Sequence, residues 1–144
     1  MLMTGSAQMD AERAFARAAR ARRLASIVRR LRGAPKACTR LPVYEPRQVR
    51  ARVASAGRGI SEIPLGAITG TLEPTRAALF DDGFRPAGAA RVRWQRLWLA
   101  EHRGAVLPPI SVVPVDDGYA IRDGHHRVSV AKACGALTIA ARVA

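Results

Sequence analysis

The C-terminal part of the chain carries the pattern that restricts the fold most strongly. Two apolar segments, 107–115 and 119–122, flank an Asp-Gly pair, which is a strong signal for a β-hairpin. Helix-forming residues follow over 124–134, and Gly135 stands where a helix usually ends. Apolar residues then alternate over 137–143, as in a half-buried strand. The order strand, strand, helix, strand predicts a compact α/β unit.

Shorter strand signals and a helix precede this unit. Residues 62–65 are typical of an edge strand, because Pro64 cannot donate to a ladder. A second short strand is predicted at 68–71, and a helix at 89–102. The fold class is therefore α+β. We expect a domain over residues 61–144 in which a small mixed sheet is packed by helices.

Asp81 and Asp82 stand before a glycine and between two aromatic residues. Neighbouring carboxylates can hold a metal ion, but aspartates in this position are usually turn formers. We interpret them as a turn, and the sequence predicts no metal site.

Residues 1–60 are predicted to form a basic helical arm and a linker. Alanine and arginine, both strong helix formers, dominate residues 11–32, and Asp10 is a suitable N-cap. One apolar stripe at helical spacing is formed by Leu24, Ile27, Val28 and Leu31. We expect this stripe to dock on the chain's own domain or on a second copy, which would make a homodimer through the N-terminal helix.

The charge is concentrated in this arm. The formal net charge is +13, and residues 1–60 carry fourteen Lys/Arg against three Asp/Glu. Such asymmetry suits a partner that is nucleic acid, an acidic protein or an anionic surface. A G+C-rich genome is an alternative source of so much arginine. The predicted nucleic-acid-binding residues are Arg20, Arg23 and Arg30.

Composition also bears on the compartment. The sequence contains no run of eighteen apolar residues, so no membrane span is predicted. The N-terminus has no signal-peptide pattern. Cys38 and Cys134 are widely spaced and fit no ligand pattern, so reduced thiols in a cytoplasmic protein are expected. Cys134 is predicted to lie on the buried face of its helix.

The turn at 123–127, Asp-Gly-His-His-Arg, brings special backbone chemistry and polar side chains together. Gly124 allows a sharp turn, and the helix that follows directs free N–H groups and a positive dipole end toward it. Such a helix start favours anions, and Arg127 adds a donor fork suited to phosphate. The predicted phosphate-binding residues are Asp123, Gly124, His125, His126, Arg127 and Ser129.

Other interpretations of the turn remain open. Asp123 can cap the helix or, with a nucleotide present, help to hold Mg²⁺. His125 or His126 can serve as general acid or base in phosphodiester or nucleotide hydrolysis. Zinc is not expected, because adjacent helical histidines point about 100° apart. The turn can also be purely structural.

These residues resemble the ParB/sulfiredoxin fold. The matching features are a proline-led first hairpin strand at 107–112, Gly-His-His-Arg at 124–127, Ala131, Gly135 and the final strand at 139–143. Further motifs resemble a small stand-alone group of ParB-like (chromosome-partitioning-protein-like) proteins. These are Ile-Pro-Leu at 63–65, Ile-Thr-Gly-Thr at 68–71, Phe-Asp-Asp-Gly-Phe-Arg-Pro at 80–86 and Arg-Trp at 93–94.

The resemblance implies a nucleotide as ligand, CTP as in partitioning proteins or ATP as in sulfiredoxins, together with Mg²⁺. His125 stands where sulfiredoxins have their catalytic cysteine and partitioning proteins an acidic residue. Sulfiredoxin chemistry is therefore not expected, and turnover is disfavoured. Partitioning proteins continue into a helix-turn-helix domain, whereas this sequence stops at Ala144, so centromere-specific DNA binding is not expected.

The sequence thus predicts a ParB-like module that binds a nucleotide or a nucleic-acid phosphate, associates with DNA and is not catalytic. One alternative is a phosphodiester or nucleotide hydrolase that uses His125 or His126. A second alternative is a protein-interaction module with a vestigial nucleotide site.

Overall fold

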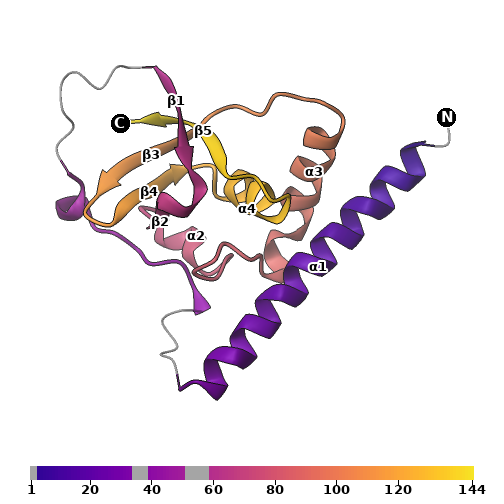
Figure 1. Ribbon diagram of the computed structural model, residues 1–144, viewed down its shortest axis with the longest axis horizontal. Helices are drawn as coiled ribbons and strands as arrows, with labels where there is room; N and C mark the ends of the chain where they lie inside the picture. Colours follow the sequence, from indigo (N-terminus) through magenta and orange to yellow (C-terminus); the bar gives the residue numbers. More distant parts are fainter. Residues whose placement is uncertain (1–2, 34–38, 51–58) are drawn as a thin grey trace.

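A computed structural model describes residues 3–33, 39–50 and 59–144, which form one five-stranded mixed sheet with helices packed against it (Figure 1). The strand order is β1-β5-β3-β4-β2. The pairs β5–β3 and β4–β2 are parallel, and the other two are antiparallel. The strands are β1 (Ile60–Pro64), β2 (Ile68–Thr71), β3 (Ile110–Val115), β4 (Gly118–Asp123) and β5 (Thr138–Val143). The predicted α+β class with a small mixed sheet is confirmed.

Four α-helices and three short 3₁₀ turns connect and flank the strands of the described chain. The helices are α1 (Met3–Leu31), α2 (Pro74–Ala77), α3 (Arg91–His102) and α4 (His125–Ala133). The 3₁₀ turns are Pro46–Gln48, Leu65–Ala67 and Gly88–Ala90. None of these helices is both long enough and apolar enough to cross a membrane.

The two faces of the sheet are covered by different parts of the chain. Val112 of β3 belongs to the main core together with Trp94 of α3 and Val128 of α4. Val113, the next residue of β3, packs on the opposite face with Tyr44. Strand alternation explains this division, because successive side chains point to opposite sides of a sheet. Helices therefore cover one face, and the segment around Tyr44 covers the other.

The C-terminal unit forms as predicted. β3 and β4 pair as an antiparallel hairpin around Asp116-Asp117, with Val115 opposite Gly118. Gly135 has φ 78°, the left-handed conformation of a helix C′ residue, and its N–H donates to the Lys132 carbonyl. β1, with Pro64 at its end, lies at the edge of the sheet. The edge-strand prediction is confirmed.

Cys134 is a correction to the sequence interpretation. It was predicted on the buried face of its helix, but it is exposed. α4 ends at Ala133, so Cys134 is the C-cap residue, and it lies in a run of exposed residues, 133–136, at the unpacked end of the helix. Cys38 lies outside the described residues.

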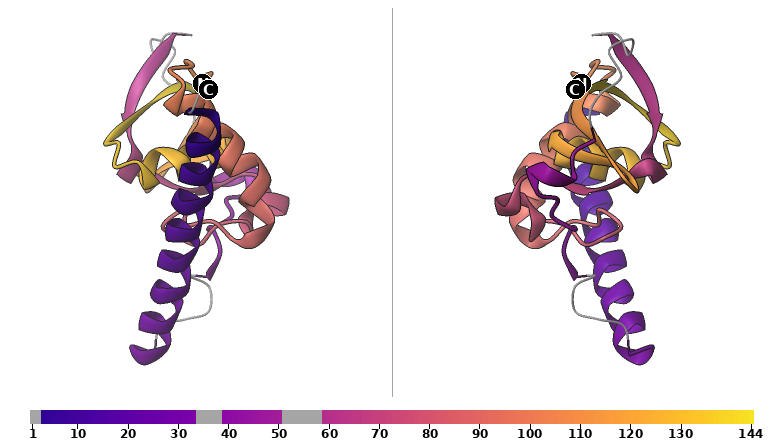
Figure 2. Two further views of the ribbon diagram at one scale, coloured as in Figure 1. Left: turned by 90° about the vertical axis from the view of Figure 1, so that its right-hand side faces the viewer. Right: turned by 90° about the vertical axis from the view of Figure 1, so that its left-hand side faces the viewer.

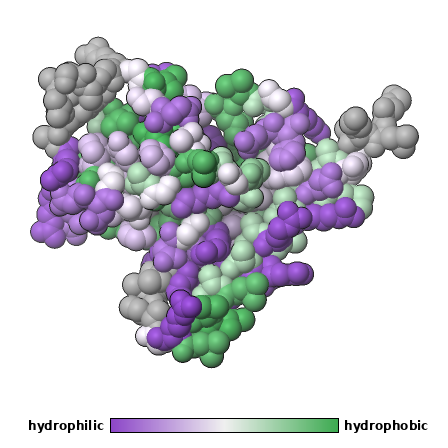
Figure 3. Space-filling model, in the orientation of Figure 1, coloured by the Kyte–Doolittle hydropathy of each residue, from purple (hydrophilic) through white to green (hydrophobic). Residues whose placement is uncertain are grey.

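α1 docks on the domain by its first half and not by the predicted apolar stripe, and contact of that stripe with a second copy stays a prediction. The helix begins at Met3, and its first half packs on the domain through Ala11 and Phe15, which are buried. Phe15 meets the ring of Trp94 edge to face, with centroids 5.6 Å apart. The predicted stripe is instead exposed, with Leu24 56% and Leu31 83% accessible. Its residues lie on the half of α1 that projects past the domain, which forms an apolar patch at the helix end (Figures 2 and 3).

The turn at residues 81–85 anchors the projecting half of α1. Oδ1 of Asp81 accepts the N–H groups of Gly83 and Arg85, at 3.0 and 2.9 Å. Oδ2 of Asp81 accepts Nη2 of Arg29 from α1 at 3.2 Å, and Asp82 accepts the same Nη2 at 2.8 Å. The interpretation of the aspartates as turn residues is confirmed. No group of three or more His, Cys, Asp or Glu in the described ranges could hold a metal ion.

Candidate functional site

The turn from β4 into α4 needs glycine at position 124. Gly124 has φ 115°, which side-chain-bearing residues rarely adopt. A Cβ there would also lie 2.8 Å from Cβ of Ile110, closer than two carbons can pack. An α-helix starts directly after this turn, and its first N–H groups have no intrahelical acceptors. Anion binding at this helix start stays a prediction.

His125 is buried and bonded to the end of β2. Its Nε2 lies 2.6 Å from Oγ1 of Thr71, which also accepts the N–H of Glu73 at 2.8 Å. Burial lowers the pKa of His125 to about 4, and the positive charge of Arg76 lowers it in the same direction. His125 is therefore a neutral imidazole at pH 7.

His126 is also buried, but it faces the core differently. Its ring meets Phe80 edge to face, with centroids 5.2 Å apart. Burial lowers its pKa to about 4, and the charges of Arg93 and Arg76 add to this effect. Both histidines are thus held neutral beside fixed positive charge.

Arg127 is used as a clamp between α4 and the chain that enters β3. Its Nη1 donates to the carbonyls of Pro108 and Pro109, at 2.6 and 2.9 Å. Its Nη2 donates to Oδ2 of Asp123 at 2.9 Å. Both terminal nitrogens of the predicted phosphate fork therefore have partners within the protein, and Asp123 pairs with Arg127 rather than capping α4.

Ser129 does not join the other predicted residues. Its hydroxyl donates to the carbonyl of Phe84 at 2.6 Å and accepts Nε1–H of Trp94 at 2.9 Å. Ser129 lies one turn further along α4, and there its side chain points into the core between α3 and the 81–85 turn. Its observed role is to join three elements.

Two arginines that the sequence reasoning did not select complete the site. Arg76 from α2 and Arg93 from α3 line a hollow of about 50 Å³ together with His125 and His126. Arg76 is half-buried and Arg93 is exposed. Neither forms an ion pair with any residue of the described ranges. Arg93 stands in the Arg-Trp motif at 93–94, but no local pattern marks either arginine as an anion-binding residue, because three separate elements form the hollow.

The site is therefore a small basic hollow at the start of α4. It offers helix N–H groups, two neutral imidazoles and two arginines that have no carboxylate partner among the described residues. This arrangement suits an anion, whose charge would relieve the repulsion among the cations. General base chemistry has less support, since Nε2 of His125 is already bonded to Thr71.

The predicted nucleic-acid-binding residues lie away from this hollow. Arg20, Arg23 and Arg30 are all exposed on α1. Their role in binding nucleic acid stays a prediction.

Comparisons with known proteins give one structural likeness. No protein-family model and no curated protein matches the chain. Among solved structures, the chain is similar to sulfiredoxin from Arabidopsis thaliana, with 26% identity and a TM-score of 0.42 over 60% of this chain and 84% of that chain.

Proposed function

We propose that this protein is a ParB-like, non-catalytic module that binds a phosphate group, carried by a nucleotide, at the start of α4. One observation carries the proposal: Arg76 and Arg93 converge on the hollow beside His125 and His126 without a carboxylate partner among the described residues. Uncompensated arginines next to a helix N-terminus suit the charge and geometry of phosphate.

The arginines that would contact the phosphate differ from the one that the sequence predicted. Arg76 and Arg93 would meet the phosphate oxygens, while Arg127 would hold the turn in place. The first N–H groups of α4 would complete the anion's hydrogen bonds. CTP and ATP are the nucleotides to test first, and Mg²⁺ would reach the site on their phosphates, since Asp123 is paired with Arg127.

Association with nucleic acid is the second part of the proposal. Arg20, Arg23 and Arg30 lie exposed on the helix that projects beyond the domain. Exposed positive charge on a helix gives affinity for a nucleic-acid phosphate backbone, and this affinity falls steeply as the salt concentration rises. Salt-insensitive or absent binding to duplex DNA at low salt would contradict this part alone.

The experiment is a thermal-shift and calorimetric panel of CTP, ATP, GTP and UTP with and without Mg²⁺. The parent protein should be stabilised by at least one triphosphate. Arg76→Gln together with Arg93→Gln should remove that stabilisation, because the pair supplies the only cations of the hollow not already bonded within the described structure.

Arg96→Gln is the matched control, because Arg96 is exposed on α3 and does not line the hollow. It should respond to nucleotide as the parent does. Equal stabilisation of the parent and the Arg76/Arg93 double variant would place the nucleotide elsewhere. A lack of response to every triphosphate would remove the nucleotide from the proposal.

A further inference from the structure

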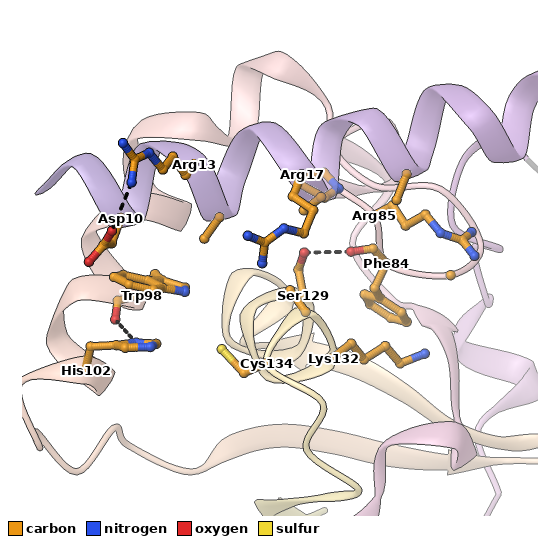
Figure 4. A pocket seen from close by; sticks show the side chains of 16 residues that line it. Asp10, Arg13, Arg17, Phe84, Arg85, Trp98, His102, Ser129, Lys132 and Cys134 are labelled. Atoms are coloured by element: carbon orange, nitrogen blue, oxygen red, sulfur yellow. Dashed lines mark hydrogen bonds and ion pairs between the residues drawn. The ribbon is translucent and has the colours of Figure 1, made fainter. Parts of the chain in front are cut away.

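A second and much larger hollow lies on another side of α4, between this helix, α1 and α3. Its volume is about 920 Å³. It is lined by the docked half of α1, by residues 83–86, by the end of α3 and by the C-terminal half of α4 (Figure 4). It shares no lining residue with the small hollow at the start of α4. A site of this size can hold a small organic molecule.

One end of this hollow is basic. Arg17 of α1 points into the hollow, and Arg85 of the 81–85 turn and Lys132 of α4 line it beside Phe84 (Figure 4). Around the whole hollow, four cationic side chains face one carboxylate, that of Asp10. Asp10 is held by Arg13 at 3.8 Å, so it does not neutralise the basic end.

Two of the three cations at this end have no ion pair within the described residues. These are Arg17 and Lys132, whereas Arg85 pairs with Asp81. Lys132 is half-buried, and Nζ lies 5.1 Å from the centroid of the Phe84 ring. Burial lowers the pKa of Lys132, and the charge of Arg85 lowers it further, while Asp81 and Asp82 raise it. An anion placed between these groups would remove that repulsion.

The other end of the hollow is aromatic. The ring of Trp98 stacks on His102, with centroids 3.5 Å apart and an interplanar angle of 16°. Nδ1 of His102 lies 3.0 Å from the Trp98 carbonyl, which holds the imidazole against the indole. Trp98 is only half-buried and lines the hollow, so it offers an apolar surface to a flat group.

We propose that this hollow binds a small planar organic anion, whose phosphate or carboxylate group meets Arg17, Arg85 and Lys132 and whose ring lies toward Trp98. A ring with a charged group matches the separation of the hollow into a basic end and an aromatic end. The proposal stands apart from phosphate binding at the start of α4, because the two sites use different residues.

Cys134 provides a local reporter of occupancy. Its thiol is exposed and lines the hollow. The chain has two cysteines, so a Cys38→Ser background leaves Cys134 as the only thiol. The rate at which Ellman's reagent labels Cys134 then reports whether the hollow is filled. Phenyl phosphate and benzoate serve as probes of the two anion types, with inorganic phosphate and phenol as charge-only and ring-only controls.

Phenyl phosphate or benzoate should slow the labelling of Cys134, and the two controls should do so only at much higher concentration. Arg17→Met and Lys132→Met should each weaken this protection about tenfold, as loss of a charge-assisted hydrogen bond does. Arg20→Gln, one turn further along α1 and outside the hollow, should leave it unchanged. The Arg76/Arg93 double variant should also keep full protection, which separates this site from the nucleotide site.

Three results would overturn the proposal. The first is no protection by either aromatic anion. The second is equal protection by inorganic phosphate, which would mean that the ring contributes nothing. The third is unchanged protection in both Arg17→Met and Lys132→Met. If circular dichroism shows that a charge variant is unfolded, Ala133→Trp replaces it in the test. Ala133 is exposed and lines the hollow, so the indole should fill the hollow. The aromatic anions should then no longer slow the labelling of Cys134.

Discussion

Nε2 of His125 and Oγ1 of Thr71 lie 2.6 Å apart, joining the first residue of α4 to the last residue of β2. The contact places an imidazole that is neutral at pH 7 at the start of α4, beside the small hollow. Because the imidazole ring is buried and already bonded to Thr71, its role is to line the small hollow at the start of α4.

The buried histidines predict a stability that depends on pH. Their folded pKa values, about 4, lie below the ordinary value of 6.5. The unfolded chain therefore binds protons first as the pH falls, and stability is lost between about pH 6.5 and 4. Each histidine should contribute about 2–3 kcal/mol across this window. Urea unfolding at pH 7.5 and pH 5 measures the change, and His125→Gln should shrink it. A pH-independent free energy of unfolding would contradict the prediction.

The clamp formed by Arg127 predicts a loss of stability in Arg127→Ala. Removal of the guanidinium leaves the carbonyls of Pro108 and Pro109 without their donor, at a cost of about 2–3 kcal/mol. Urea unfolding measures it. Arg122→Ala, at an exposed position of β4, should change the free energy by less than about 0.5 kcal/mol. Equal effects of the two substitutions would show that the clamp contributes nothing.

The contacts of Asp81 predict that this residue stabilises the packing of α1 on the domain. Its buried carboxylate accepts Arg29 from α1, Arg85 and two backbone N–H groups. Asp81→Asn removes the charge and should cost about 3–5 kcal/mol. Limited proteolysis should then cut near the end of α1 faster than in the parent. Asp82→Asn, at a side chain that is 44% exposed, is the control and should have a small effect.

Because α1 packs on the domain by its first half, truncation of an apolar side chain should reduce stability much more in that half than in the second. Phe15→Ala should cost about 3–4 kcal/mol, because it opens a cavity against Trp94. Leu31→Ala should change the free energy of unfolding by less than about 0.5 kcal/mol, since Leu31 is 83% exposed. Thermal unfolding of both variants tests the contrast. A large loss in Leu31→Ala would mean that a second copy covers the stripe.

The proposed phosphate site predicts that affinity rises as the pH falls. An anion beside His125 and His126 would raise their pKa values, so the bound state would take up protons. Calorimetric titration with the best-binding triphosphate at pH 7.5, 6.5 and 5.5 should show tighter binding and proton uptake at the lower values. His126→Gln should weaken this dependence. The opposite trend would place the phosphate away from the histidines.

Much of the fold could be read from local pattern. The hairpin around Asp-Gly, the edge strand ending at Pro64 and the turn at Gly124 each depend on backbone chemistry within a few residues, which the residue type specifies directly. The apolar stripe of α1 shows the limit. Leu24 and Leu31 have helical spacing, but spacing says nothing about which half of the helix meets the domain.

The amino-acid sequence alone determined the α+β class, the position of the glycine turn and the start of a helix directly after it. Only the tertiary structure decided which side chains serve that helix start. Arg127 follows the histidines in sequence, but it donates to carbonyls of the segment before β3. The arginines that line the hollow without such partners among the described residues, Arg76 and Arg93, come from α2 and α3. The physical reason is that a turn is set by local dihedral angles, whereas charge convergence is set by the packing of elements far apart in the chain.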